Sequence, residues 1–204
     1  MSEFQTAAVV AAVFIGIVAI MLAAMAQVQS RAQRQLIDTW TAFAMTRGFE
    51  FVPKSGPWYR RRGPKITGSV DGVAFVLAVE RVHRGKHSVA FTRVRGELAR
   101  PLRSKLVVAA RDWTAKLRFL FSPPIVETGH TRFDAATMVR TRERGEALAL
   151  LDADLRARIS AFPRKLGIEC VDRAATISWR AAEHDPHVLA AGCEMLAALC
   201  RPHR

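Results

Sequence analysis

The chain has 204 residues, of which 31 are Lys or Arg and 18 are Asp or Glu, so its formal net charge is +13 at neutral pH. Half of the residues are apolar, which is ordinary for a globular domain and excludes a wholly disordered chain. Three cysteines, Cys170, Cys193 and Cys200, are odd in number and widely spaced, which excludes a disulfide framework and suits a reducing compartment.

The positive charge is concentrated in the middle of the chain. Residues 1–53 contain three cations and three acids, residues 54–118 contain sixteen and four, and residues 119–204 contain twelve and eleven. A local excess of cations points to a polyanionic partner. The alternative explanation of the basic excess is genome composition. Arg outnumbers Lys 25 to 6, which suggests a genome in which Arg is simply common.

The N-terminal region contains a long uncharged stretch. The twenty residues from Ala7 to Ala26 would span about 30 Å as a helix, which matches the hydrocarbon core of a bilayer. A cleaved signal peptide is the alternative, since Ala24 and Ala26 flank Met25 as at a cleavage site. The absence of Lys or Arg before the stretch favours a retained transmembrane helix over residues 6–28.

Charges beside this stretch predict its orientation. Arg31 and Arg34 follow it, and positive residues near a span stay in the cytoplasm. We therefore expect a bacterial inner-membrane protein whose N-terminal tail, residues 1–5, faces outward. Ala8, Ala12 and Gly16 fall four residues apart on one helix face, which favours self-association of the transmembrane helix into a homo-oligomer.

The helical pattern continues beyond the predicted span. Leu36, Trp40 and Phe43 repeat at helical spacing, and Gly48 is placed to end the helix. This pattern predicts a membrane-proximal helix over residues 29–48 that packs through Trp40 on a cytoplasmic domain formed by residues 49–204.

Strand patterns dominate the first half of that domain. Residues 65–70 and 73–79 flank Asp71-Gly72, the strongest hairpin signal in the chain. Residues 88–98 and 105–111 predict two further strands, giving a four-strand antiparallel meander. A strand near 137–141 and a second hairpin from 167–171 and 175–179 follow.

Two helices are predicted in the second half. An apolar stripe from Leu148 to Phe162 predicts one amphipathic helix over residues 143–162. Asp185 as N-cap and Pro186 at the first position predict the start of the last helix. The element order predicts an α+β fold, an antiparallel sheet with helices on one face.

The loop "WYRRRGPK" combines aromatic rings with cations. The predicted binding residues are Trp58, Tyr59, Arg60, Arg61, Arg62 and Lys65. Rings beside guanidinium groups suit an anionic lipid interface, and the same mixture suits stacking on single-stranded nucleic acid. An ordinary surface loop is the third interpretation.

Metal and catalytic chemistry find little support in the sequence. His83 and His87 lie near Glu80, but their spacing matches no closed zinc site. The "EHDPH" stretch, residues 183–187, is explained by helix capping at Asp185. No phosphate loop, nucleophile elbow or zinc-protease motif is present, so no cofactor, no metal and no catalytic residue are predicted.

One stretch resembles a pattern of uncharacterised bacterial membrane-anchored α+β domains. The resemblance covers residues 128–159, about a sixth of the chain, and departs from the pattern at His130, where an acid is common. The matching residues are Gly129, Phe133, Asp134, Val139, Leu150 and Leu151. It implies an α+β domain behind a membrane span and no assigned activity. Physically, Phe133 would pack under the sheet and Asp134 would cap the turn.

These observations together predict a membrane-anchored, non-catalytic binding or scaffold domain that presents a basic face to anionic lipid or to an acidic protein. The alternatives are an enzyme with an unrecognised site and a nucleic-acid-binding domain, although nucleic acid is the less favoured partner.

Overall fold

The computed structural model describes residues 3–53, 63–84, 87–111 and 123–202. Their backbone divides into two compact units, Met1–Asp38 and Thr39–Arg204. The helices are α1 (Glu3–Arg47), α2 (Thr131–Ala136), α3 (Arg144–Leu150), α4 (Ala153–Ala161) and α5 (Pro186–Cys200). The strands are β1 (Glu50–Val52), β2 (Lys65–Val70), β3 (Val73–Arg84), β4 (His87–Glu97), β5 (Leu106–Ala110), β6 (Ile125–Val126), β7 (Thr137–Arg140), β8 (Leu166–Val171) and β9 (Ala174–Arg180).

The first unit consists of the N-terminal part of α1. Large apolar side chains in this part are exposed to solvent, among them Phe14, Ile20, Leu22 and Val28. In the second unit, α1 ends at Arg47 and Gly48 follows with φ of +68°, the left-handed conformation that commonly terminates helices. The predicted helix end is confirmed.

The membrane-spanning helix predicted over residues 6–28 is wrong. Within the described part of the chain, no helix offers an apolar stretch long enough to cross a bilayer. The finding also overturns the predicted single-pass topology, the inner-membrane location and the outward-facing N terminus.

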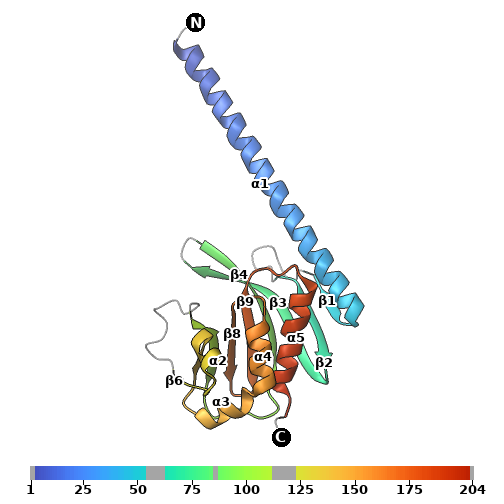
Figure 1. The fold of residues 1–204 in the computed structure, drawn as a ribbon. Helices are drawn as coiled ribbons and strands as arrows, with labels where there is room; N and C mark the ends of the chain where they lie inside the picture. The colour runs from blue at the N-terminus through green and yellow to red at the C-terminus, as the bar shows by residue number, and fades with distance from the viewer. Residues whose placement is uncertain (1–2, 54–62, 85–86, 112–122, 203–204) are drawn as a thin grey trace. The chain divides into compact units, whose positions relative to one another are not determined.

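The nine strands form one antiparallel sheet in the order β1-β2-β3-β4-β9-β8-β5-β7-β6 (Figure 1). The α+β fold is therefore confirmed. Asp71 and Gly72 both have positive φ, 51° and 80°, and connect β2 to β3 in the tight turn that their sequence predicts. The β7 strand and the β8–β9 hairpin also lie where the sequence predicts them.

The predicted four-strand meander is wrong at its last strand. β2, β3 and β4 are neighbours, but the β8–β9 hairpin lies between β4 and β5. The reason lies in the segment that follows β4. The amide of Leu98 donates to the carbonyl of Arg173 at 2.7 Å, and that of Leu102 donates to the carbonyl of Asp172 at 3.0 Å. The chain therefore crosses the β8–β9 turn before it enters the sheet as β5.

The helix predicted over residues 143–162 is two helices, α3 and α4. Leu151 has φ −88° and ψ 61°, which ends α3, and the Asp152 side chain accepts a hydrogen bond from the Leu155 amide at 2.8 Å as the N-cap of α4. The Asp152 carboxylate serves as this cap, and the Arg156 side chain donates to the Leu151 carbonyl. An ion pair one turn apart on α4 joins Asp154 and Arg158 at 2.7 Å.

The α5 helix packs on one side of the sheet. Its N-cap is Asp185, which accepts from the His187 amide at 2.8 Å, and Pro186 follows as predicted. A methyl group on Gly192 would lie 2.7 Å from the Trp179 ring, so glycine allows α5 to approach β9 closely. Trp179 is fully buried and stacks edge-on against Phe162, with ring centroids 5.3 Å apart.

The segment around α2 has the predicted local roles. Phe133 is buried, and the Asp134 carboxylate accepts hydrogen bonds from the Thr128 amide, the Thr128 hydroxyl and the Gly129 amide at 2.8–3.1 Å. Burial raises the pKa of Asp134, but these hydrogen bonds outweigh it and lower the pKa below its ordinary value. Asp134 thus holds the turn before α2.

Candidate functional site

A basic surface lies on the side of the sheet opposite α5. Successive strand residues point to opposite sides, and α5 contacts the side that carries Val94 and Trp179. Arg93, Arg95 and Arg180 alternate with those residues and therefore point away from α5. Register places Lys65 of β2 on the same side, two strands from Arg93. We call Lys65, Arg93, Arg95 and Arg180 the basic face.

One carboxylate, that of Glu80, forms ion pairs with two cations of the basic face. Glu80 of β3 binds Arg93 at 2.5 Å through one oxygen and Arg95 at 2.6 Å through the other. The three side chains are 30–46% exposed, so solvent screens the pairs and one positive charge remains in excess. Among the described contacts, the exposed Lys65 and Arg180 have no ion-pair partner. The face therefore offers cations that a partner's carboxylates could pair with.

The structure places only one of the loop residues that the sequence singled out. Trp58, Tyr59, Arg60, Arg61 and Arg62 lie outside the described residues, so their role stays a prediction. Lys65 is exposed at the first position of β2.

Sequence reasoning missed the cations of the sheet itself. The signal was present in "FTRVRGE", where Arg93 and Arg95 are two residues apart in a strand and must share a side. Arg180 is far away in the sequence, and only the pairing of β4 with β9 brings it alongside.

Of the three residues predicted to mediate self-association, Ala8, Ala12 and Gly16, the structure describes the surroundings of Gly16 alone. The side chains of Ala8 and Ala12 lie outside the described residues. Gly16 is exposed, and a methyl group built on it would meet no described atom within 4 Å. Self-association through these residues stays a prediction. The transmembrane helix in which it was expected is not supported.

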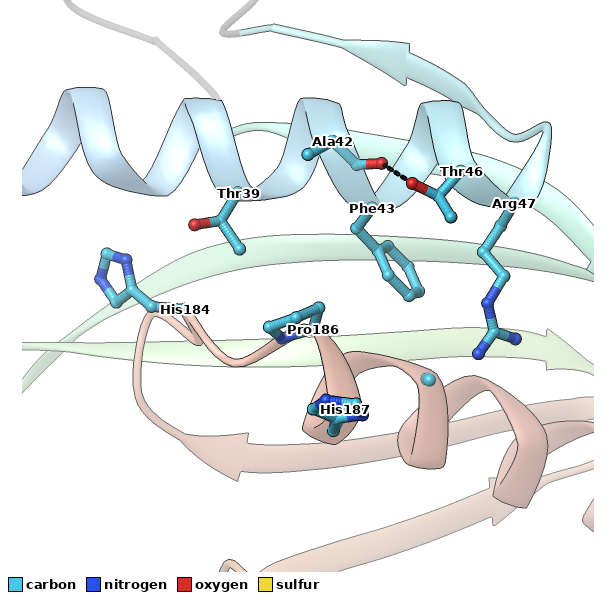
Figure 2. A pocket seen from close by; sticks show the side chains of 9 residues that line it. Thr39, Ala42, Phe43, Thr46, Arg47, His184, Pro186 and His187 are labelled. Atoms are coloured by element: carbon cyan, nitrogen blue, oxygen red, sulfur yellow. Dashed lines mark hydrogen bonds between the residues drawn. The ribbon is translucent and has the colours of Figure 1, made fainter.

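A groove of about 500 Å³ lies on the other side of the sheet, between the last turns of α1 and the start of α5 (Figure 2). Phe43 and Arg47 project into it from α1, and Pro186 lies across from them. Exposed His184 and His187 form its rim. Arg47 is already engaged, because it reaches Glu194 at 3.5 Å and lies 5.9 Å from the Phe43 ring centroid.

A buried carboxylate, Glu183, lies beside this groove at the end of β9. One oxygen accepts from the amides of His184 and Asp185, both at 3.2 Å, and from Arg164 at 3.4 Å. The other accepts from the Trp179 indole at 3.1 Å and from Arg164 at 3.2 Å. Both oxygens are thus occupied by donors, which makes Glu183 a structural anchor and a poor general base.

The main chain of Glu183 joins further elements to the same anchor. The Trp40 indole of α1 donates to its carbonyl at 2.9 Å, and its amide donates to the Thr92 hydroxyl of β4 at 3.1 Å. Trp40 is fully buried, which confirms that this part of α1 packs on the α+β unit. One residue therefore connects α1, β4, β9 and the start of α5.

The three cysteines are free, buried thiols. Burial raises the pKa of each of Cys170, Cys193 and Cys200 to about 12, so the reactive thiolate is scarce at neutral pH. No group of three or more His, Cys, Asp or Glu side chains within the described residues could hold a metal ion.

We expect the thiols to be inert in the folded protein. At pH 8 a thiol-specific chromogenic reagent should label none of the three in native buffer and all three in denaturant, because unfolding restores both access and an ordinary pKa. The absorbance of the released chromophore measures the count. Fast labelling of one thiol in native buffer would contradict its burial.

Comparison with known proteins gives a likeness of fold. No family model matches the chain, and no curated protein matches it. The crystal structure of the mycobacterial trehalose monomycolate transport factor A, TtfA, superposes with a TM-score of 0.58. The alignment covers 81% of this chain and 92% of that chain at 10% sequence identity. The α+β fold of this chain is similar to that of TtfA.

Proposed function

We propose that this chain is a non-catalytic binding protein whose basic face receives an acidic protein partner. The observation that carries the proposal is the set of cations that the sheet aligns on the side opposite α5: Arg93 and Arg95 around Glu80, with Lys65 and Arg180 beside them. Guanidinium groups bind carboxylates with defined geometry, which suits recognition of Asp and Glu side chains.

Acids on the same side of the sheet favour a protein over an anionic lipid surface. By register, Glu50 of β1 and Glu169 of β8 share this side with Glu80. Lys105 pairs with Glu169, as Arg93 and Arg95 pair with Glu80, so cations and acids alternate on this side. A protein surface can match such an alternation with its own acids and cations, whereas a uniformly anionic bilayer cannot. The mixed pattern therefore fits a partner of matching mixed charge.

A binding role also agrees with the chemistry of the groups that could otherwise serve an enzyme. The Glu183 carboxylate is occupied by donors, and the thiols have a pKa of about 12. The neighbour in fold, TtfA, is described as a transport factor.

Binding of the full chain to poly-L-glutamate tests the proposal. We expect salt-sensitive binding that weakens about tenfold when Lys65, Arg93 and Arg95 are all changed to Gln, because the basic face then loses three cations and keeps the Glu80 carboxylate. Fluorescence anisotropy of labelled poly-L-glutamate, titrated at low and high salt, gives the dissociation constants.

A matched variant controls for net charge. Arg100, Arg132 and Arg144 are exposed cations outside the basic face, and changing all three to Gln removes the same charge. This variant should bind poly-L-glutamate within about twofold of the parent chain. Equal weakening by both triple variants would reduce the effect to net charge. Stronger retention of a single-stranded oligonucleotide than of poly-L-glutamate would favour the nucleic-acid alternative.

A further inference from the structure

The β3–β4 hairpin extends beyond the strands that flank it. β2 pairs with β3 only as far as Ala78, and β9 pairs with β4 only from Phe91 onward. The two strands of the hairpin continue past these points and pair with each other as far as Arg84 and His87 (Figure 1). Within the described residues, no strand lies beside the segment His87–Ala90 of β4 on the side where β9 would continue. We call this segment the open edge.

The backbone of the open edge alternates in direction. Arg84 and His87 close the hairpin as a hydrogen-bonded pair, so His87 and Val89 direct their amide and carbonyl groups toward β3. Ser88 and Ala90 direct theirs outward, into the line of β9. Two donors and two acceptors are thereby presented at the spacing of an added antiparallel strand.

The two outermost strands of the sheet are less accessible to pairing because they are short. β1 has three residues and β6 has two, a common protection of sheet edges against added strands. The hairpin strands, by contrast, have twelve and eleven residues. The open edge is therefore better suited to an additional strand than β1 or β6.

Cations flank the open edge. The exposed Arg180 ends β9 opposite Phe91, where a strand added in the line of β9 would begin. The exposed Arg81 lies opposite Ala90 in the β3–β4 pair. Arg81 and Arg180 lie on opposite sides of the sheet, because their partners Ala90 and Phe91 are consecutive in β4. A second copy of this hairpin would add its own cations to both sides and be repelled, whereas an extended segment with Asp or Glu at alternate positions, on the side of Arg180, would match that cation.

We propose that the open edge of β4 binds an extended acidic segment of a partner protein as an added antiparallel strand, with a carboxylate of that segment on Arg180. This inference rests on the proposed function, in that the partner is an acidic protein. It adds the mode of recognition: main-chain hydrogen bonds to Ser88 and Ala90 supply affinity, and the cations supply specificity.

The test uses the full chain and a short labelled peptide in which Val and Glu alternate. Changing Ala90 to Pro removes the outward amide but leaves the ladder with β3 intact, since that amide does not face β3. We expect Ala90→Pro to weaken peptide binding about tenfold, and Ala90→Val, which keeps the amide, to leave it unchanged. Arg180→Gln should weaken binding severalfold.

A measurement from the peptide side covers the case in which Ala90→Pro disturbs folding. A peptide with N-methyl groups on alternate residues, placed on the amides that would pair with β4, should bind the parent chain about tenfold more weakly than the unmodified peptide. The Lys version of the peptide should not bind. Equal affinity of the methylated and unmodified peptides would overturn strand addition.

The outcomes separate this inference from the proposed function. If Ala90→Pro folds and binds the peptide normally while the Lys65, Arg93 and Arg95 variant does not, the basic face binds and the open edge does not. If neither variant affects binding, both proposals fail. A concentration-dependent dimer without peptide, abolished by Ala90→Pro, would assign the edge to a second copy of this chain.

Discussion

Replacing Glu183 with Ala lowers the free energy of unfolding by about 3 kcal/mol. Glu183 is 3% exposed, and its carboxylate is the acceptor for the Trp179 indole and for two amides at the start of α5. Truncation leaves these donors without an acceptor in a region that water does not reach. Urea denaturation of the full chain, followed by tryptophan fluorescence, measures the loss as a lower midpoint at an unchanged slope.

Two further variants separate anchoring from loss of charge. Asp154→Ala breaks an exposed pair with Arg158 and should cost about 0.5 kcal/mol or less. Glu183→Gln keeps the shape of the side chain but turns an acceptor into a donor facing Trp179 or the α5 amides, so it should destabilise nearly as much as Ala. A Glu183→Ala midpoint equal to that of Asp154→Ala would show that the anchor contributes little.

The contacts of Glu183 also show why sequence reasoning did not single out this residue. In "EHDPH" it stands among ligand-type side chains, and its local pattern suggests a metal or a cap. Its partners include Trp40, Thr92 and Arg164, which come from other parts of the chain. Such a hub depends on tertiary packing, and no spacing rule within five residues can reveal it.

Local signals, by contrast, predicted local structure well. The Asp71-Gly72 turn, the Gly48 helix end and the Asp185–Pro186 helix start each depend on the backbone preferences of one or two residues. The break at Leu151 was missed because the apolar residues keep helical spacing across it. Apolar spacing indicates which residues are buried, but it does not show whether the helix is continuous. Leu151 and Leu155 are both buried, although Leu151 ends α3 and Leu155 lies in α4.

Sheet order was beyond the sequence because it depends on long-range pairing. Nothing near β5 indicates that β8 will be its neighbour, since the hydrogen bonds that guide the chain there join Leu98 and Leu102 to the β8–β9 turn. The same insertion brings Arg180 beside β4 and so completes the basic face. The sequence therefore predicted that the site is basic and that it includes Lys65. It did not predict which strands bring the other cations together.

Replacing Trp40 with Ala should cost about 4 kcal/mol, the largest effect of a single substitution that we expect. Trp40 is fully buried, and its indole donates to the Glu183 carbonyl. Removing the ring leaves a cavity between the last turns of α1 and the loop before α5, and it leaves that carbonyl without its donor. Urea denaturation measures the loss, and hydrogen exchange locates it.

The pattern of exchange decides how the energy is lost. If Trp40 secures the last turns of α1, amides of residues 39–47 in Trp40→Ala should exchange much faster than those of β3 and β4, because local opening then precedes global unfolding. Trp40→Phe keeps most of the apolar volume but loses the hydrogen bond, so it should recover more than half of the stability. The groove lined by Phe43 and Pro186 depends on the same docking and would open with it. Uniform acceleration of exchange across the sheet would instead make Trp40 part of the common core, with no separate role in holding α1.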